Sequence, residues 1–202
     1  MANEAHFQGE PETVWLTETG RSDRHMRLLK NFWYKDWNGR QWDAPAGTVV
    51  DGASIPQALW TLVGSPYTGD YRRASIVHDV ACVGANTQQR RAADKMFFQA
   101  CRDGGCSIVQ AMILYVGVRI GAWASFSAAP MWIAPDLKLA GIPSDGPRLM
   151  KAREEERMER DFSTIAEAVV RQGETDDVDE LERRVDAVAT SVTKLSNLTS
   201  LG

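Results

Sequence analysis

Three polar side chains in the middle of the chain have the types that acid–base chemistry requires: His78, Asp79 and Asp94. A histidine held by a carboxylate can act as a general base towards water, because the carboxylate fixes the tautomer of the ring. The alternative is a buried pair that locks two helices together, since an unpaired buried polar group costs about 1–3 kcal/mol. The other histidines, His6 and His25, lie in the N-terminal part. A histidine base would therefore be His78, with Asp94 as its partner.

Two predicted helices must position these side chains. The apolar stretches at 71–83 and 88–101 predict the helices, and the turn-like residues 84–87 separate them. Helices joined by a short turn are usually antiparallel neighbours. This geometry would bring Asp94 against the ring of His78.

Ser54 and Cys82 are candidate nucleophiles. Ser54 would complete a catalytic triad with His78 and Asp94, although no Gly-x-Ser-x-Gly elbow surrounds it. The other interpretation is that Asp51 and Ser54 hold a turn and cap the helix that follows. Cys82 comes four residues after His78, on the same helical face, which allows a Cys-His nucleophile. Such a cysteine is more often part of the core.

Asp79 is the candidate metal ligand, with calcium as the metal. His78, Asp79 and Asp94 offer carboxylate oxygens and one imidazole, without the Cys and His density of a structural zinc site. The alternative is an ion pair between Asp79 and a nearby arginine, which we expect in preference to a metal. The arginines within reach along the sequence are Arg72, Arg73, Arg90 and Arg91.

The composition is that of a protein with a real core, since 44% of the 202 residues are hydrophobic and 25% are charged. A net charge of −4 argues against a nucleic-acid partner. Three cysteines suit a reducing compartment better than a disulfide framework. The first residues lack the apolar run of a signal peptide. The most apolar span, Ile108–Ala124, is interrupted by polar residues and glycines, which predicts a core helix and no transmembrane segment.

The pattern along the chain predicts four segments: a flexible N-terminus over 1–12, a globular domain over 13–126, a Pro-rich linker over 127–147 and a helical oligomerisation segment over 148–202. The domain is expected to be α+β, with a small antiparallel β-hairpin sheet packed on a bundle of three to four helices. The predicted strands are 13–17, 26–35, 41–43 and 48–50, with Asn38-Gly39 as a two-residue hairpin turn. The further predicted helices are 57–63 and 107–123.

Apolar residues in the C-terminal segment recur three and four positions apart. They are Val178, Leu181, Val185, Val188, Val192 and Leu195. A sustained heptad pattern predicts self-association through a coiled coil, as a dimer or a trimer. The alternative is an amphipathic helix that folds back on the domain.

Several short motifs lie between residues 42 and 119. They are Trp42-Asp43-Ala44-Pro45-Ala46-Gly47, Asp51-Gly52-Ala53-Ser54-Ile55-Pro56, Tyr71-Arg72-Arg73-Ala74, Val77-His78-Asp79, Arg91-Ala92-Ala93-Asp94-Lys95-Met96-Phe97 and Tyr115-Val116-Gly117-Val118-Arg119. Together they resemble a phage and prophage family, domain of unknown function 1353, over about Trp15 to Trp123. The resemblance implies a phage or prophage origin and brings no established activity. The C-terminal heptads lie outside it.

The order His-Asp, turn, Asp-x-x-Phe is similar to that of the secreted phospholipases A2, and of their smaller bacterial members above all. This resemblance implies that His78 is the base, Asp79 the calcium ligand and Asp94 the residue that orients His78. Two features of those enzymes are missing: a glycine-rich calcium loop upstream and the disulfides that brace the helices.

Two functions fit these observations. The first, which we favour, is a phage or prophage structural or assembly protein, located in the virion or the host cytoplasm. It would be a docking module that self-associates through its C-terminal helices and binds other particle proteins. The alternative is a hydrolase in which the His78–Asp94 dyad activates water, with calcium as a cofactor.

Overall fold

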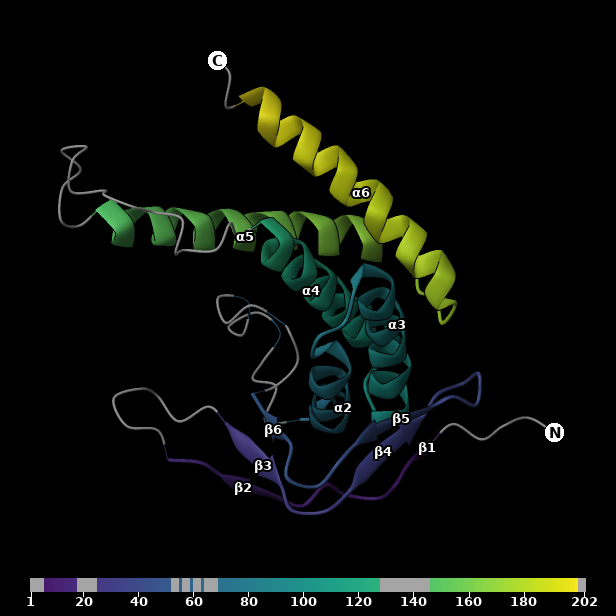
Figure 1. Cartoon of the computed structure of the whole chain (residues 1–202). Helices are drawn as coiled ribbons and strands as arrows, with labels where there is room; N and C mark the ends of the chain where they lie inside the picture. The colour runs from purple at the N-terminus through teal and green to yellow at the C-terminus, as the bar shows by residue number, and fades with distance from the viewer. Residues whose placement is uncertain are drawn as a thin grey trace.

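The computed structural model describes residues 6–17, 25–51, 69–127 and 146–199, together with Ile55, Leu59 and Val63. For residues 122–127, 146–154 and 193–199 the description is of the backbone. These residues form two small sheets on one side of a group of helices (Figure 1). The predicted α+β class is therefore confirmed. None of the helices in the described ranges is long and apolar enough to cross a membrane.

The strands pair into two three-stranded antiparallel sheets, ordered β1-β4-β5 and β2-β3-β6. Their bounds are β1 (His6–Phe7), β2 (Thr13–Trp15), β3 (Met26–Leu28), β4 (Phe32–Lys35), β5 (Gln41–Ala44) and β6 (Val49–Val50). The sequence predicted one sheet, with a single run over 26–35. The chain interrupts that run at residues 29–31, where the Asn31 side chain accepts the N–H of Ala46. The two halves of the run consequently join different sheets.

The hairpin between β4 and β5 has a five-residue loop, residues 36–40. The hairpin predicted from Asn38-Gly39 is confirmed, but the predicted loop length of two residues is wrong. The Asp36 carboxylate accepts the backbone N–H groups of Asn38 and Arg40 at 3.0 and 2.9 Å, which holds the longer loop together. Gly39 has a φ of +82°, a conformation that glycine adopts without steric cost.

The N-terminal residues are more ordered than the sequence predicted. Strand β1 pairs with β4, although the prediction was a flexible segment over residues 1–12. The Phe7 ring lies 5.9 Å from the Phe32 ring and 4.8 Å from the Tyr34 ring. This aromatic packing anchors a strand that is too short to be stable on its own.

Five helices follow the strands in the described residues. They are α2 (Arg72–Cys82), α3 (Thr87–Gly104), α4 (Ile108–Ser127), α5 (Gly146–Val170) and α6 (Val178–Thr199). The helix predicted at 57–63 and most of the predicted linker lie outside the described residues. Helix α3 begins with a capping box formed by Asn86 and Gln89, which fixes its start so that four residues separate it from the end of α2.

Helices α2 and α3 pack side by side above the sheets, and α4 lies against α3 (Figure 1). Tyr34 ties the first sheet to α3, because its hydroxyl donates to Asp103 at 2.6 Å. Helices α5 and α6, here called the C-terminal arm, pack on each other and on α4 and α3. Leu181 and Val185 of α6 are completely buried. The arm therefore shares one core with the rest of the protein.

Candidate functional site

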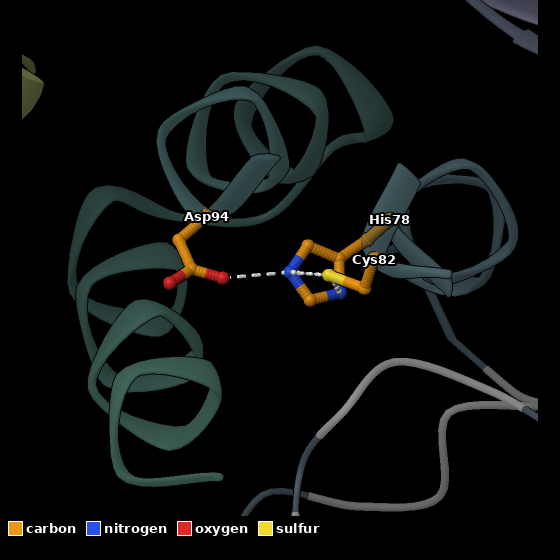
Figure 2. Close-up of side chains that lie close together, drawn as sticks. All are labelled: His78, Cys82 and Asp94. Carbon is orange, nitrogen blue, oxygen red and sulfur yellow. Dashed lines mark hydrogen bonds and ion pairs between the residues drawn. The ribbon is translucent and has the colours of Figure 1, made fainter. Parts of the chain in front are cut away.

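His78 and Asp94 are in direct contact, as the two-helix prediction required. His78 comes from α2 and Asp94 from α3, and His78 Nε2 lies 2.8 Å from Asp94 Oδ1 (Figure 2). Both side chains are 0% exposed. The ring also lies against Phe97, with 4.9 Å between ring centroids. The pair is therefore enclosed, and neither residue reaches solvent by itself.

Cys82 is the third member of this cluster. It lies one helical turn after His78, and its sulfur is 3.5 Å from Nε2 and 3.9 Å from Nδ1 of the ring (Figure 2). Unlike His78 and Asp94, Cys82 is partly exposed. The predicted same-face position of Cys82 is confirmed, and Cys82 is the residue through which the cluster meets the surface. Ser54, the other candidate nucleophile, lies outside the described residues.

Arg119 of α4 is a functional neighbour that sequence reasoning missed. Its Nη1 lies 3.2 Å from Asp94 Oδ2, and its side chain is 3% exposed. Asp94 therefore uses one oxygen for His78 and the other for Arg119. The sequence signals were its place in the motif at residues 115–119 and its position as an arginine within a mostly apolar helix, where a charged side chain needs a buried partner.

The ion pairs continue from Arg119 onto the C-terminal arm. Arg119 Nη2 lies 3.1 Å from Asp186 Oδ1, and Arg91 bridges Asp186 and Glu182 at 2.9 and 2.8 Å. Lys95 then contacts Glu182 at 2.7 Å. Acidic residues spaced three or four apart on α6 thus face basic residues spaced four apart on α3. An ordered series of charges joins the buried histidine pair to the arm.

The surroundings of His78 favour the charged ring. Burial lowers the pKa of His78, but the Cys82 sulfur and the hydrogen bond to Asp94 more than offset it, so that the pKa is raised to about 10. An imidazolium is then the form of the ring at neutral pH. A ring in that form cannot accept a proton from water.

Asp79 belongs to a different cluster. Its Oδ2 accepts the backbone N–H of Asp51 at 2.9 Å. Burial, together with the neighbouring Asp51 carboxylate, raises the pKa of Asp79 to about 6. Among the described residues no ion pair joins Asp79 to an arginine, since Arg72 and Arg73 contact Glu10 and Arg91 contacts the acids of α6. Calcium binding at Asp79 stays a prediction.

His78, Cys82 and Asp94 are also the residues best placed to hold a metal ion, with donor atoms within 4.8 Å of one another. Their donors are already in use, however. Nε2 faces Oδ1 at hydrogen-bond distance, and Arg119 binds Oδ2. A tetrahedral zinc ion would require Nε2 and Oδ1 to separate, since zinc–ligand bonds of about 2 Å place two ligands more than about 3 Å apart. The arrangement fits a thiol–imidazole–carboxylate set better than a metal site.

The residues predicted to mediate oligomerisation lie on the face of α6 that contacts the rest of the chain. Leu181 and Val185 are buried, and Val178, Val188 and Val192 are partly buried against the same core. The side chain of Leu195 lies outside the described residues. This arrangement is the fold-back that the sequence left open as an alternative, while self-association stays a prediction.

The fold and the site define an α+β domain with a buried His–Asp pair at its centre and a helical arm attached to it. Residues 26–118 match the family model described as Protein of unknown function (DUF1353). This match agrees with the resemblance that the sequence motifs predicted. The match ends one residue before Arg119 and leaves out the C-terminal arm.

Two uncharacterized proteins of Sinorhizobium fredii (strain NBRC 101917 / NGR234) are similar to the chain. Protein y4jT is 37% identical over 109 residues, which are 53% of this chain and 30% of that protein. Protein y4iH is 31% identical over 108 residues, which are 54% of this chain and 42% of that protein. The chain thus spans less than half the length of these relatives. No solved structure matches it.

Proposed function

We propose that the chain is a structural or assembly protein of a phage or prophage particle, acting in the virion or the host cytoplasm as a docking module. The observation that supports a binding role is the enclosure of the His78–Asp94 pair. Both Asp94 oxygens are bonded, and the ring is charged at neutral pH. The pair then acts as a lock between helices, and the surface of the domain is left for partners.

The series of ion pairs supports this role in a second way. It ties α3 and α4 to α6 through Arg119, Arg91 and Lys95, so that the arm is held in one position on the domain. A module that positions other proteins benefits from such a rigid arrangement, because less conformational entropy is lost on binding. The partners we propose are other particle proteins.

Self-association is part of the proposal. The inward face of α6 is occupied in the folded chain, because Leu181 and Val185 are buried. A dimer or trimer that uses this face requires α6 of one copy to pack on α3 of another. Exchange of an identical element between copies is a low-cost route to such oligomers. The charges of α3 and α6 are complementary, and they would pair in the same way between copies.

The experiment that tests the proposal is a particle analysis. The strain that carries the gene is induced, the particles are purified on a density gradient, and the chain is quantified by mass spectrometry against the major capsid protein. A fixed ratio across all particle-containing fractions is expected. Absence of the chain from the particles, with normal particle yield when the gene is deleted, would overturn the proposal.

The second candidate function is the hydrolase, favoured by the 2.8 Å contact between His78 and Asp94. In this mechanism His78 would activate water, and Asp79 would bind calcium beside it. The test is release of fatty acid from phospholipid vesicles by the full chain, with and without calcium. Activity that calcium increases and that His78→Gln and Asp79→Asn abolish would support this candidate. A chain that is inactive on vesicles under both conditions would exclude it.

A further inference from the structure

We propose that Cys82 is a nucleophilic thiol, activated by the His78–Asp94 pair beneath it, and that it is acylated by activated carboxylic esters and thioesters. This site goes beyond the docking function and does not depend on it. It also differs from a water-activating histidine, since the reacting atom is the sulfur of Cys82.

The cluster is arranged so that only its sulfur can meet a substrate. His78 and Asp94 are 0% exposed. Cys82, one helical turn further along α2, is partly exposed. Its Sγ lies 3.9 Å from His78 Nδ1, the ring nitrogen that does not face Asp94, and 3.5 Å from Nε2. A nucleophile and the base that activates it must lie within hydrogen-bond reach, with a third group that orients the base. Cys82, His78 and Asp94 meet these requirements.

The charges around the ring support the same role. Asp94 stabilises the imidazolium form of His78, and Arg119 fixes Asp94 from the other side. A cationic ring beside a sulfur stabilises negative charge on that sulfur, and the thiolate is the nucleophilic form of cysteine. His78 and Asp94 act here as positioning residues, because the substrate would touch only Cys82.

The other cysteines of the chain provide a comparison. Cys101 and Cys106 are 0% and 1% exposed and hydrogen-bond to each other. Burial raises the pKa of Cys101 well above its usual value, which disfavours its thiolate. The hydrogen bond with Cys101 lowers the pKa of Cys106, but Cys106 is enclosed. The partial exposure of Cys82 should therefore make it the reactive thiol of the folded chain.

A metal ion is the competing use of the same side chains. The direct contact between Nε2 and Oδ1, and the hold of Arg119 on Oδ2, both argue against it. The partial exposure of Cys82 also argues against a closed structural metal site, in which all ligands are shielded.

The proposed reaction is an acyl transfer to sulfur. Sγ of Cys82 attacks the carbonyl carbon of the ester, and the bond between that carbon and the leaving oxygen breaks. The leaving oxygen takes the electron pair of that bond and a proton from solvent, which balances the proton that the thiol of Cys82 loses to solvent when it ionises beside the charged ring. The products are a thioester on Cys82 and the free alcohol or phenol. Water can later hydrolyse the thioester to the acid and the original thiol.

The test uses the full chain and p-nitrophenyl acetate. We expect a burst of one equivalent of nitrophenol per chain and an acetyl group on the peptide that contains Cys82. Cys82→Ser should abolish the burst, and Cys101→Ser and Cys106→Ser should retain it. His78→Gln and Asp94→Asn should each slow acylation at least about 10-fold, because each variant weakens the cationic ring that stabilises negative charge on the sulfur.

A measurement on the unmodified chain covers the case in which a variant does not fold. Iodoacetamide should alkylate Cys82 at least about 10-fold faster than it alkylates glutathione at pH 7, since the charged ring of His78 lies beside the sulfur. A rate equal to that of glutathione would overturn the proposal. So would a His78→Gln chain that has a native circular dichroism spectrum and an unchanged rate. Binding of one zinc ion per chain that Cys82→Ser abolishes would overturn it in favour of a metal site.

Discussion

Arg119 bridges Asp94 and Asp186, so a single buried guanidinium connects the His78 pair of the α+β domain to helix α6 of the arm. Its two terminal nitrogens contact two carboxylates on different helices. Asp94 is completely buried and Asp186 is 34% exposed. The centre of the domain and the position of the arm are therefore energetically coupled through one side chain.

Removing this cation should destabilise the protein strongly. Arg119→Met keeps an unbranched side chain but removes one of the two cations beside the buried Asp94 carboxylate, a change that typically costs about 3–5 kcal/mol. Urea unfolding followed by circular dichroism measures it. The matched control is Arg91→Met, because Arg91 is 40% exposed and exposed pairs contribute about 0–1 kcal/mol. Equal costs for the two variants would contradict the role given to Arg119.

Stability should fall as the pH rises from neutral, because of His78. Its pKa is about 10 in the folded protein, above the 6.5 of a free ring. The native state thus keeps a proton that the unfolded chain releases, so the contribution is complete below pH 6.5 and is lost as the pH rises through about 10. The slope should approach about 1.4 kcal/mol per pH unit within this window.

The measurement is urea unfolding of the wild type and of His78→Gln at several pH values between about 6 and 10, the window that linkage defines. The wild type should lose its advantage over the variant as the pH rises. His6→Gln is the control, since His6 lies on the exposed side of β1, and its profile should follow the wild type. Parallel profiles for wild type and His78→Gln would show that the ring is neutral in the folded state.

The effect of Asp79 on the pH dependence of stability should be opposite to that of a typical salt-bridged acid. Its pKa is raised to about 6 from 3.8, so the native state holds a proton more tightly than the unfolded chain. This contribution is present below pH 3.8 and is lost as the pH rises through about 6. Asp79→Asn should therefore be more stable than the wild type above about pH 6, with a difference that shrinks towards about pH 4. Thermal unfolding measures it, and the exposed Asp43→Asn should show no such trend.

Replacing Leu181 tests whether α6 packs on its own domain or only on the domain of another copy. Leu181 is completely buried, so Leu181→Ala should cost about 2–5 kcal/mol. The loss should already be present at low protein concentration, because the contact lies within one chain. Ser191→Ala, on the exposed face of α6, is the control. A cost that appears only at high concentration would instead place the face between copies.

Exchange of the arm can be tested with complementary charges. Lys95→Glu in one chain and Glu182→Lys in another each place like charges together between α3 and α6. The two variant chains are mixed and briefly unfolded. On refolding they should form a heterodimer, because the lysine introduced at position 182 of one copy then faces the acid introduced at position 95 of the other. Native mass spectrometry detects it, and the double variant in one chain should remain unaffected by mixing. A mixture without heterodimers would argue against exchange.

The sequence was sufficient for the contact between His78 and Asp94, because both lie in apolar segments on either side of a short turn. Local spacing carries that information. Arg119 could not be predicted as their partner, since its contacts with Asp94 and Asp186 bring three distant helices together. The sequence offered only its place in a motif and an unexplained charge within a mostly apolar helix.

The C-terminal pattern illustrates a different limit. Spacing of three and four predicts an apolar face on α6, and Leu181 and Val185 do form one. The same spacing serves a coiled coil and a helix packed within its own chain, so the pattern cannot choose the occupant of that face. Within the chain, ion pairs add to the packing of α6 on α3. Arg91 and Lys95 of α3 pair with acidic residues that lie beside the apolar face of α6.

The place of Arg119 also decides where this protein can be divided. A fragment ending with the family match at residue 118 would lose the guanidinium and enclose the Asp94 carboxylate with only His78 to neutralise it. A fragment that continues to the end of α4 at Ser127 retains both. A recombinant fragment that is expected to fold must therefore be longer than the matched region, because it has to include Arg119.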